Sequence, residues 1–189
     1  LDKVYISVNY LSEKVISLVG DGSRWGLSIE YLQEAKPLGT GGALGLITEP
    51  KHQHYIVTNG DVYSRIDFLK LLKFHKIHNG DATMVAVPIS HTVPFGVVKH
   101  DRGEFLEIIE KPTYEYQCNS GIYVISSDAL SLVQKGEFLD LPDLMTRLQS
   151  SSRRVNVYET EEYWADIGNI SELDRNQRML ETLAEPGPE

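Results

Sequence analysis

Residues 27–47 read LSIEYLQEAKPLGTGGALGLI and place a strand, a glycine-rich turn and a short helix in direct succession. The hydrophobic pattern predicts the strand over 27–33 and the helix through 43–47. Glycines between a strand and a helix let a ligand approach the backbone and meet its N–H groups. The turn is not a dinucleotide fingerprint, which would need glycine at Leu44, and no G-K-[ST] of a P-loop follows. A tight turn without a ligand remains the alternative interpretation.

The same alternation of strand and helix patterns continues on both sides of this stretch. It predicts an α/β fold with a mostly parallel mixed sheet and helices on both faces, in one domain. An Asp-Arg-Gly turn at 101–103 adds a hairpin. The expected strands are 3–9, 27–33, 54–59, 82–88, 96–100, 105–110, 121–126 and 154–158, and the expected helices are 12–20, 43–47, 68–75, 127–133, 141–149 and 170–183.

Composition and charge limit the partners. The 189 residues carry 18 Lys and Arg against 27 Asp and Glu, a net charge of −9. Such a chain lacks the basic surface of a general nucleic-acid binder, but it can bind nucleotides through local cations, helix N-termini or a bridging metal. No apolar run reaches the roughly 18 residues of a membrane-spanning helix, so no membrane association is expected. The single cysteine, Cys118, fits a reducing cytoplasmic setting.

Three further segments place charged residues at expected strand ends, where ligands gather in α/β sheets. Asp61 follows the strand 54–59 and is suited to a hard cation such as Mg²⁺, with a turn residue as the alternative. Asp166 lies between Trp164 and Gly168, with a helix N-cap as the alternative. Glu110 and Lys111 could take sugar hydroxyls and a phosphate, with a surface ion pair as the alternative. Because neighbours in a regular strand face opposite ways, both can serve one ligand only if Pro112 makes the strand end irregular.

Together these segments resemble the sugar-1-phosphate nucleotidylyltransferases, which make nucleoside-diphosphate sugars. The resemblance runs from about Val4 to about Leu173 and is strongest to the mannose-1-phosphate guanylyltransferase branch. Each motif is weak alone, but their ordered conjunction is specific. The matching stretches are VNY at 8–10, Glu34, PLGTGGA at 37–43, NGD at 59–61, PFG at 94–96, EKP at 110–112, NSGIY at 119–123 and WADIG at 164–168.

The resemblance implies a Rossmann-like fold of the nucleotide-diphospho-sugar transferase type, and it implies roles residue by residue. Asp61, Lys111 and Asp166 would be catalytic, with Mg²⁺ held by the two aspartates. The sugar phosphate would contact Gly96, Glu110, Lys111 and Asn119. The nucleotide would contact Glu34, Gly39, Thr40 and Gly60.

The chain departs from the family at its start. The family opens with a strand, a G-G-x-G-T-R phosphate loop and a downstream Pro-Lys, which grip the triphosphate. None of these is present here. The fold is therefore expected to lack its first βα unit, with 1–183 an N-terminally incomplete domain and 184–189 a tail. Without the phosphate loop, this chain alone is expected to be inactive.

The implied reaction joins a sugar 1-phosphate to a nucleoside triphosphate and gives a nucleoside-diphosphate sugar, a polysaccharide precursor, plus pyrophosphate. GTP is favoured, because the Glu34 carboxylate can accept both adjacent donors of guanine. A non-catalytic nucleotide-sugar-binding or regulatory module of the same fold is the alternative. A glycosyltransferase would carry an Asp-x-Asp pair, whereas Asp61 is followed by Val62 and Tyr63. Homo-oligomerisation is left open.

Overall fold

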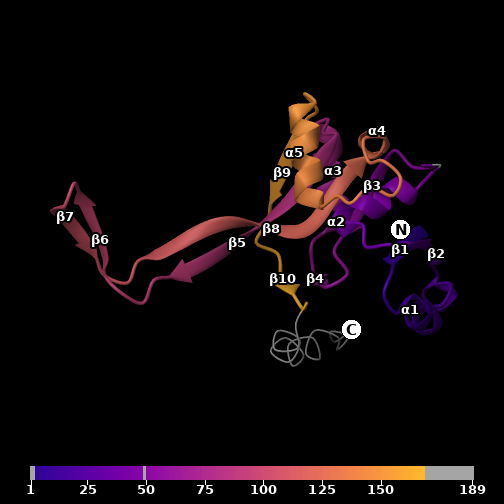
Figure 1. Ribbon diagram of the computed structural model, residues 1–189, viewed down its shortest axis with the longest axis horizontal. Coiled ribbons are helices and arrows are strands. Elements are labelled where there is room, and N and C mark those ends of the chain that lie inside the picture. Colours follow the sequence, from indigo (N-terminus) through magenta and orange to yellow (C-terminus); the bar gives the residue numbers. More distant parts are fainter. Residues whose placement is uncertain (1–2, 49, 169–189) are drawn as a thin grey trace, which may run out of the picture. The chain divides into compact units, whose positions relative to one another are not determined.

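A computed structural model describes residues 3–48 and 50–168 (Figure 1). The chain forms two compact units, which are described separately below. Unit 1 comprises Leu1–Val57, His75–Thr83 and Val124–Asn156, and unit 2 comprises Thr58–Phe74, Met84–Tyr123 and Val157–Glu189. Among the described residues, no helix combines the length and the apolar character needed to cross a membrane.

Unit 1 opens with a parallel β-α-β arrangement. Strand β1 (Lys3–Val8) pairs with β2 (Ser28–Gln33) in a register that runs from Lys3↔Ser28 to Val8↔Gln33. Parallel neighbours need a crossover, which α1 (Ser12–Val19) and the 3-10 turn η1 (Ser23–Trp25) provide. Ser12 is the first residue of α1, and Leu11 holds the N-cap position.

The glycine-rich stretch forms α2 (Gly39–Gly42) and then η2 (Ala43–Leu46), also in unit 1. Later in the chain, α4 (Ser127–Leu130) is capped by the Ser126 hydroxyl, which accepts a bond from the Ala129 amide. Helix α5 (Leu141–Ser150) starts with a proline in its first turn, where the missing N–H costs nothing. Its apolar stripe is buried and consists of Leu141, Leu144, Met145 and Leu148.

The core strands form a four-stranded sheet in the order β3-β8-β5-β9. Their bounds are His54–Thr58 for β3, Thr113–Ser126 for β8, Ala82–Thr92 for β5 and Val155–Glu159 for β9. The first half of β5 and the second half of β8 are mostly apolar and buried, including Val85, Ile122 and Ile125. Along the chain, each of these strands, like helix α3 (Phe68–Ile77), runs from one unit into the other.

Unit 2 contains two short antiparallel pairs. Strand β4 (Val62–Ser64) pairs with β10 (Trp164–Asp166), and β6 (Val97–Asp101) pairs with β7 (Glu104–Ile109). The turn of the β6–β7 hairpin has Arg102 and Gly103 at positive φ, as the Asp-Arg-Gly signal predicts.

The α/β class and the hairpin at 101–103 are confirmed. The described strands form four separate sheets, whereas one mostly parallel mixed sheet was expected, and β4 pairs antiparallel with β10. Strands β4 and β10 were not predicted, because three residues are too few to show a period. β8 begins at Thr113, well before the predicted start at 121. The prediction missed residues Thr113–Gln117 because they are exposed and carry no apolar run. The helix predicted over 170–183 lies outside the described residues.

Candidate functional site

Asp61 and Asp166 meet in unit 2 through the β4–β10 pairing. Asp166 lies opposite Val62 in the register, and the Ile167 amide donates to the Asp61 carbonyl at 2.8 Å. A Cβ placed on Gly168 would lie 2.8 Å from Asp61 Oδ2 and 3.1 Å from Asp166 Oδ1. The two carboxylates therefore lie beside Gly168, and both residues are exposed.

This donor set fits Mg²⁺, which binds one or two carboxylates and completes its shell with waters and substrate phosphates. Among the described residues there is no cluster of three or more His, Cys, Asp or Glu that could form an all-protein site. The absence of a side chain on Gly168 leaves room next to both carboxylates. Asp166 Oδ1 also accepts the Gly168 amide at 2.9 Å, while the helix that the N-cap alternative requires lies outside the described residues.

Residues 119–121 of β8 contact both segments that carry these aspartates. The Asn59 amide donates to the Gly121 carbonyl at 3.0 Å, and Trp164 Nε1 donates to the Ser120 carbonyl at 2.7 Å. Gly121 has φ +74°, and a Cβ there would lie 2.8 Å from Asn59 Nδ2, so only glycine fits. Asn119 Nδ2 donates to the Tyr123 hydroxyl at 2.6 Å. Burial raises the pKa of Tyr123, which keeps the phenol neutral.

Gly96 and Glu110 are neighbours across the open end of the β6–β7 hairpin. A Cβ on Gly96 would lie 2.9 Å from Glu110 Oε2 and 2.8 Å from Ile108 Cδ1. Strand β7 ends at Ile109, and Lys111 has φ 46°, a left-handed conformation that is uncommon for a side-chain-bearing residue. The irregular strand end that the Glu-Lys-Pro sequence predicts is thus confirmed. The described ion pairs do not join Glu110 to Lys111, which argues against the surface-pair alternative.

Glu34, in unit 1, is held by local hydrogen bonds. One carboxylate oxygen accepts the Ser7 hydroxyl, and the other accepts the Leu38 amide at 2.8 Å. The Asn9 side chain donates to the Glu34 carbonyl at 2.7 Å. Each carboxylate oxygen has a second lone pair, so these bonds orient the group without saturating it. Through its bond to the Leu38 amide, the Glu34 carboxylate also caps the turn that follows it.

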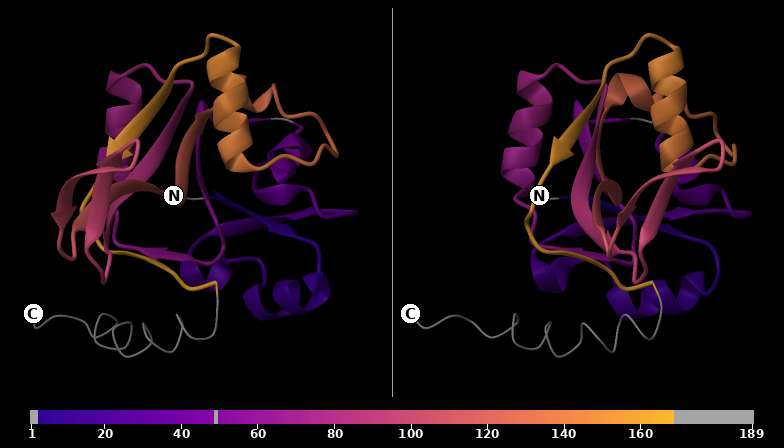
Figure 2. Two further views of the ribbon diagram at one scale, coloured as in Figure 1. Left: turned by 60° about the vertical axis from the view of Figure 1, so that its left-hand side comes forward. Right: turned by 90° about the vertical axis from the view of Figure 1, so that its left-hand side faces the viewer.

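The glycine-rich loop packs against the segment that precedes α5. The Gly41 amide donates to the Leu139 carbonyl at 2.8 Å, and the Thr40 amide donates to Asp140 Oδ1 at 2.9 Å. A Cβ on Gly42 would lie 2.3 Å from the Glu137 carbonyl oxygen. Both views of Figure 2 show this orange segment beside the purple α2. The close approach of the neighbouring backbone therefore explains why glycines occur in this loop. Two of the N–H groups that were expected to meet a ligand, those of Thr40 and Gly41, already donate hydrogen bonds within the protein.

Gly60 differs from these glycines. A Cβ at this position would meet open space, and Gly60 is exposed. Packing therefore does not require glycine next to Asp61.

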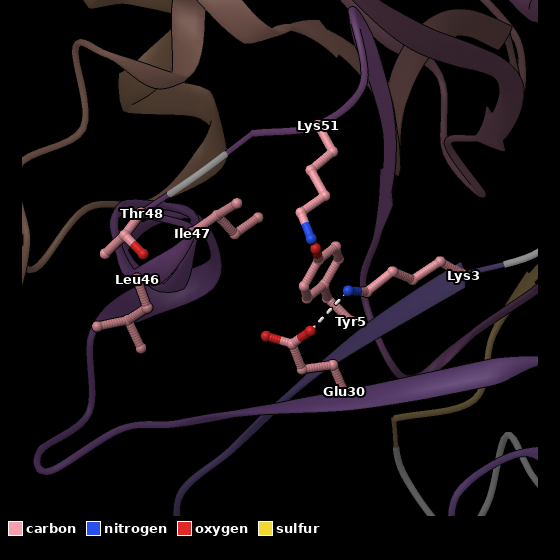
Figure 3. A pocket seen from close by; sticks show the side chains of 7 residues that line it. All are labelled: Lys3, Tyr5, Glu30, Leu46, Ile47, Thr48 and Lys51. Atoms are coloured by element: carbon pink, nitrogen blue, oxygen red, sulfur yellow. Dashed lines mark hydrogen bonds and ion pairs between the residues drawn. The ribbon is translucent and has the colours of Figure 1, made fainter.

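A small cavity of about 150 Å³ lies elsewhere in unit 1 (Figure 3). Lys3 donates to Glu30 there at 2.6 Å, and its ammonium group lies 4.7 Å from the centre of the Tyr5 ring. None of the residues that the sequence proposes as ligand contacts lines it. The lining residues are Lys3, Tyr5, Glu30, Leu46, Ile47, Thr48 and Lys51.

Sequence comparison identifies relatives over almost the whole chain. Residues 1–182 match the family described as nucleotidyl transferase. The chain is 29% identical to the mannose-1-phosphate guanylyltransferase of Mycobacterium tuberculosis, covering 100% of this chain and 54% of that protein. It is 30% identical to the mannose-1-phosphate guanyltransferase of Yarrowia lipolytica, covering 98% of this chain and 53% of that protein. The chain thus spans about half the length of these curated relatives.

Structure comparison supports the same fold. HddC from Yersinia pseudotuberculosis superposes with a TM-score of 0.72 over 95% of this chain and 79% of its own, at 21% identity. A second structure of HddC, complexed with GMP-PN, superposes with a TM-score of 0.69 over 93% of this chain and 77% of its own, at 22% identity.

Proposed function

This chain belongs to the nucleotidyl transferase family, and we propose that it is the part of a sugar-1-phosphate nucleotidylyltransferase that holds the metal and the sugar phosphate. The observation that carries the proposal is the convergence of Asp61 and Asp166 on the space beside Gly168. The guanylyltransferase relatives and the HddC complex with GMP-PN favour a guanine nucleotide. We also propose that residues 1–183 form a single Rossmann-like domain of the nucleotide-diphospho-sugar transferase type. The proposed location of the protein is the cytoplasm.

In the proposed reaction, a phosphate oxygen of the sugar 1-phosphate attacks the α-phosphorus of the nucleotide, and pyrophosphate leaves. This oxygen is ionised at neutral pH, so no side chain needs to act as a general base. Bound Mg²⁺ would neutralise charge on the two phosphate groups. Asp61 and Asp166 would hold it, and the Lys111 ammonium would anchor the nucleophile as a point charge. Catalysis then consists of positioning and charge neutralisation.

Recognition divides between the remaining proposed residues. Glu110 accepts hydrogen bonds from hydroxyl groups of the sugar. Its carboxylate lies next to Gly96, and any side chain at position 96 would displace this carboxylate. Asn119 and Gly96 line the sugar site. Glu34, Gly39, Thr40 and Gly60 contact the nucleotide, and Glu34 accepts the ring N–H and the amino group of guanine.

The test is a screen of the intact protein for pyrophosphate release with Mg²⁺, across four nucleoside triphosphates and several sugar 1-phosphates. We expect release only when both substrates are present, with GTP preferred. Binding of nucleotide sugar without release of pyrophosphate would instead establish the non-catalytic module.

A further inference from the structure

We infer that Asp140 is a positioning residue that fixes the glycine-rich loop for nucleotide binding; the inference rests on the proposed function, in which Gly39 and Thr40 contact the nucleotide. Asp140 lies 100 residues from Thr40 in sequence and directly precedes α5.

Asp140 occupies the N-cap position of α5, with φ −91° and ψ 150°. An N-cap aspartate ordinarily accepts an amide from the first turn of its own helix. Among the described residues, the Asp140 side chain makes no such bond. Its Oδ1 instead accepts the Thr40 amide at 2.9 Å and the Thr40 hydroxyl at 3.3 Å. The carboxylate therefore serves the loop rather than the helix.

The Thr40 side chain completes the link in the other direction. Its hydroxyl oxygen accepts the Leu141 amide at 2.9 Å, so Thr40 takes the capping role that Asp140 leaves. The exchange resembles a capping box, in which two residues satisfy each other's amides, but it joins two distant segments. It ties the position of Thr40 to the start of a helix whose apolar stripe is buried.

Backbone bonds extend this link along the loop. The Leu139 amide donates to the Leu38 carbonyl at 2.9 Å, next to the Gly41 bond to Leu139. Gly39 has φ +74°, and a Cβ there would lie 2.7 Å from Asp140 Oδ1. Gly39 thus permits the close approach through which Asp140 sets the backbone path of the loop.

The charge of Asp140 also indicates which part of a nucleotide the loop can meet. A carboxylate bonded to the Thr40 amide repels a phosphate at the same place, while the N-terminus of α5 stabilises that carboxylate. Asp140 therefore disfavours a triphosphate at this part of the loop.

The test compares Asp140→Ala and Asp140→Asn with Asp143→Ala, an exposed change in the first turn of the same helix. In the intact enzyme, Asp140→Ala should raise KM for the nucleoside triphosphate about tenfold, because a charge-assisted bond to the loop is lost. KM for the sugar phosphate and kcat should stay within about twofold. Asp140→Asn keeps an acceptor oxygen, so its nucleotide KM should rise by less than about threefold. Asp143→Ala should match the wild type.

An unchanged nucleotide KM in Asp140→Ala, or equal rises for both substrates, would overturn the inference while leaving the proposed function intact. If Asp140→Ala does not fold, Asp140→Glu keeps the charge but shifts the carboxylate away from the Thr40 amide, and it should raise nucleotide KM alone. If the wild type releases no pyrophosphate, the proposed function fails, and calorimetric titration with GTP decides the inference. An affinity for GTP about tenfold weaker in Asp140→Ala than in the wild type supports the inference. Equal affinities, or no binding of GTP by the wild type, overturn the inference.

Discussion

Two carboxylate oxygens, Asp61 Oδ2 and Asp166 Oδ1, lie 2.8 and 3.1 Å from the point where a side chain at Gly168 would begin. The sequence motif Trp-Ala-Asp-Ile-Gly draws attention to Asp166, but it does not show what the glycine contacts. Only the antiparallel pairing of β4 with β10 brings Asp61 to the same place. Both aspartates could be proposed from their motifs, whereas the role of Gly168 depends on a contact between segments about 100 residues apart.

Lys111 combines a proposed ligand contact with a strained backbone. Lys111→Ala should raise KM for the sugar phosphate at least about tenfold and leave nucleotide KM nearly unchanged, because a point charge on the phosphate is lost. Lys111→Gly should have the same kinetic defect, but it should be about 0.5–1 kcal/mol more stable than Lys111→Ala, because glycine adopts φ 46° without a steric penalty. Steady-state kinetics and urea unfolding measure the two effects. Equal KM rises for both substrates, or equal stability of the two variants, would contradict this interpretation.

Glu34 tests the base preference. Glu34→Gln should reduce the preference for GTP over UTP by about tenfold, because one acceptor becomes a donor facing the guanine donors. The local bond to Ser7 provides the control. Ser7→Ala keeps the carboxylate and should leave selectivity unchanged, as measured by kcat/KM ratios. An equal loss of selectivity in both variants would mean that the effect comes from the structure of the turn after Glu34. A wild type that prefers a pyrimidine nucleotide would refute the hypothesis that Glu34 recognises guanine.

At the scale of elements, α3 carries a buried polar group that the sequence pattern only partly indicates. His75 lies in α3 and His78 directly follows this helix, at a spacing that metals can use. The His75 ring is fully buried; its Nδ1 lies 2.8 Å from Thr83 Oγ1 and its Nε2 lies 3.2 Å from His54 Nδ1. The side-chain partner from β3 could not be foreseen, because spacing within one helix says nothing about the strand beside it.

This histidine predicts acid sensitivity. Burial, with a further contribution from His54, lowers the pKa of His75 from 6.5 to about 4. The unfolded chain therefore takes up a proton below pH 6.5, whereas the folded chain resists until about pH 4. The free energy of unfolding should fall by up to about 3 kcal/mol as the pH drops from 6.5 to 4. Urea unfolding at several pH values measures this. The fall should be smaller in His75→Leu but unchanged in His91→Gln, an exposed site; the same slope in all three proteins would refute it.

The glycine-rich loop makes an element-scale prediction about stability. Gly42→Ala should destabilise the protein by about 2–3 kcal/mol, because its Cβ would lie 2.3 Å from the Glu137 carbonyl oxygen. Gly60→Ala should change stability by less than about 0.5 kcal/mol, since its Cβ would meet open space. Thermal unfolding compares the two variants. A mild effect at Gly42 would mean that the loop packs less tightly against the segment preceding α5.

At the scale of the whole molecule, periodicity predicts most core elements to within a few residues, because burial imposes a regular pattern on β1, β3, α3 and α5. It does not predict how strands assemble, since pairing across the chain leaves little local trace. The same limit applies to the site. Asp61, Lys111 and Asp166 could be proposed from motifs, but Asp140 could not, because an aspartate before a helical proline predicts only a helix start.

The most direct test of the proposed metal site is a Mg²⁺ titration of pyrophosphate release by the intact enzyme with Asp61→Asn, Asp166→Asn and the double variant. If both carboxylates hold one Mg²⁺, each single variant should lose at least about a hundredfold in kcat, and the double variant should lose little more. A single variant with wild-type Mg²⁺ dependence, or losses that multiply in the double variant, would contradict a shared metal site beside Gly168.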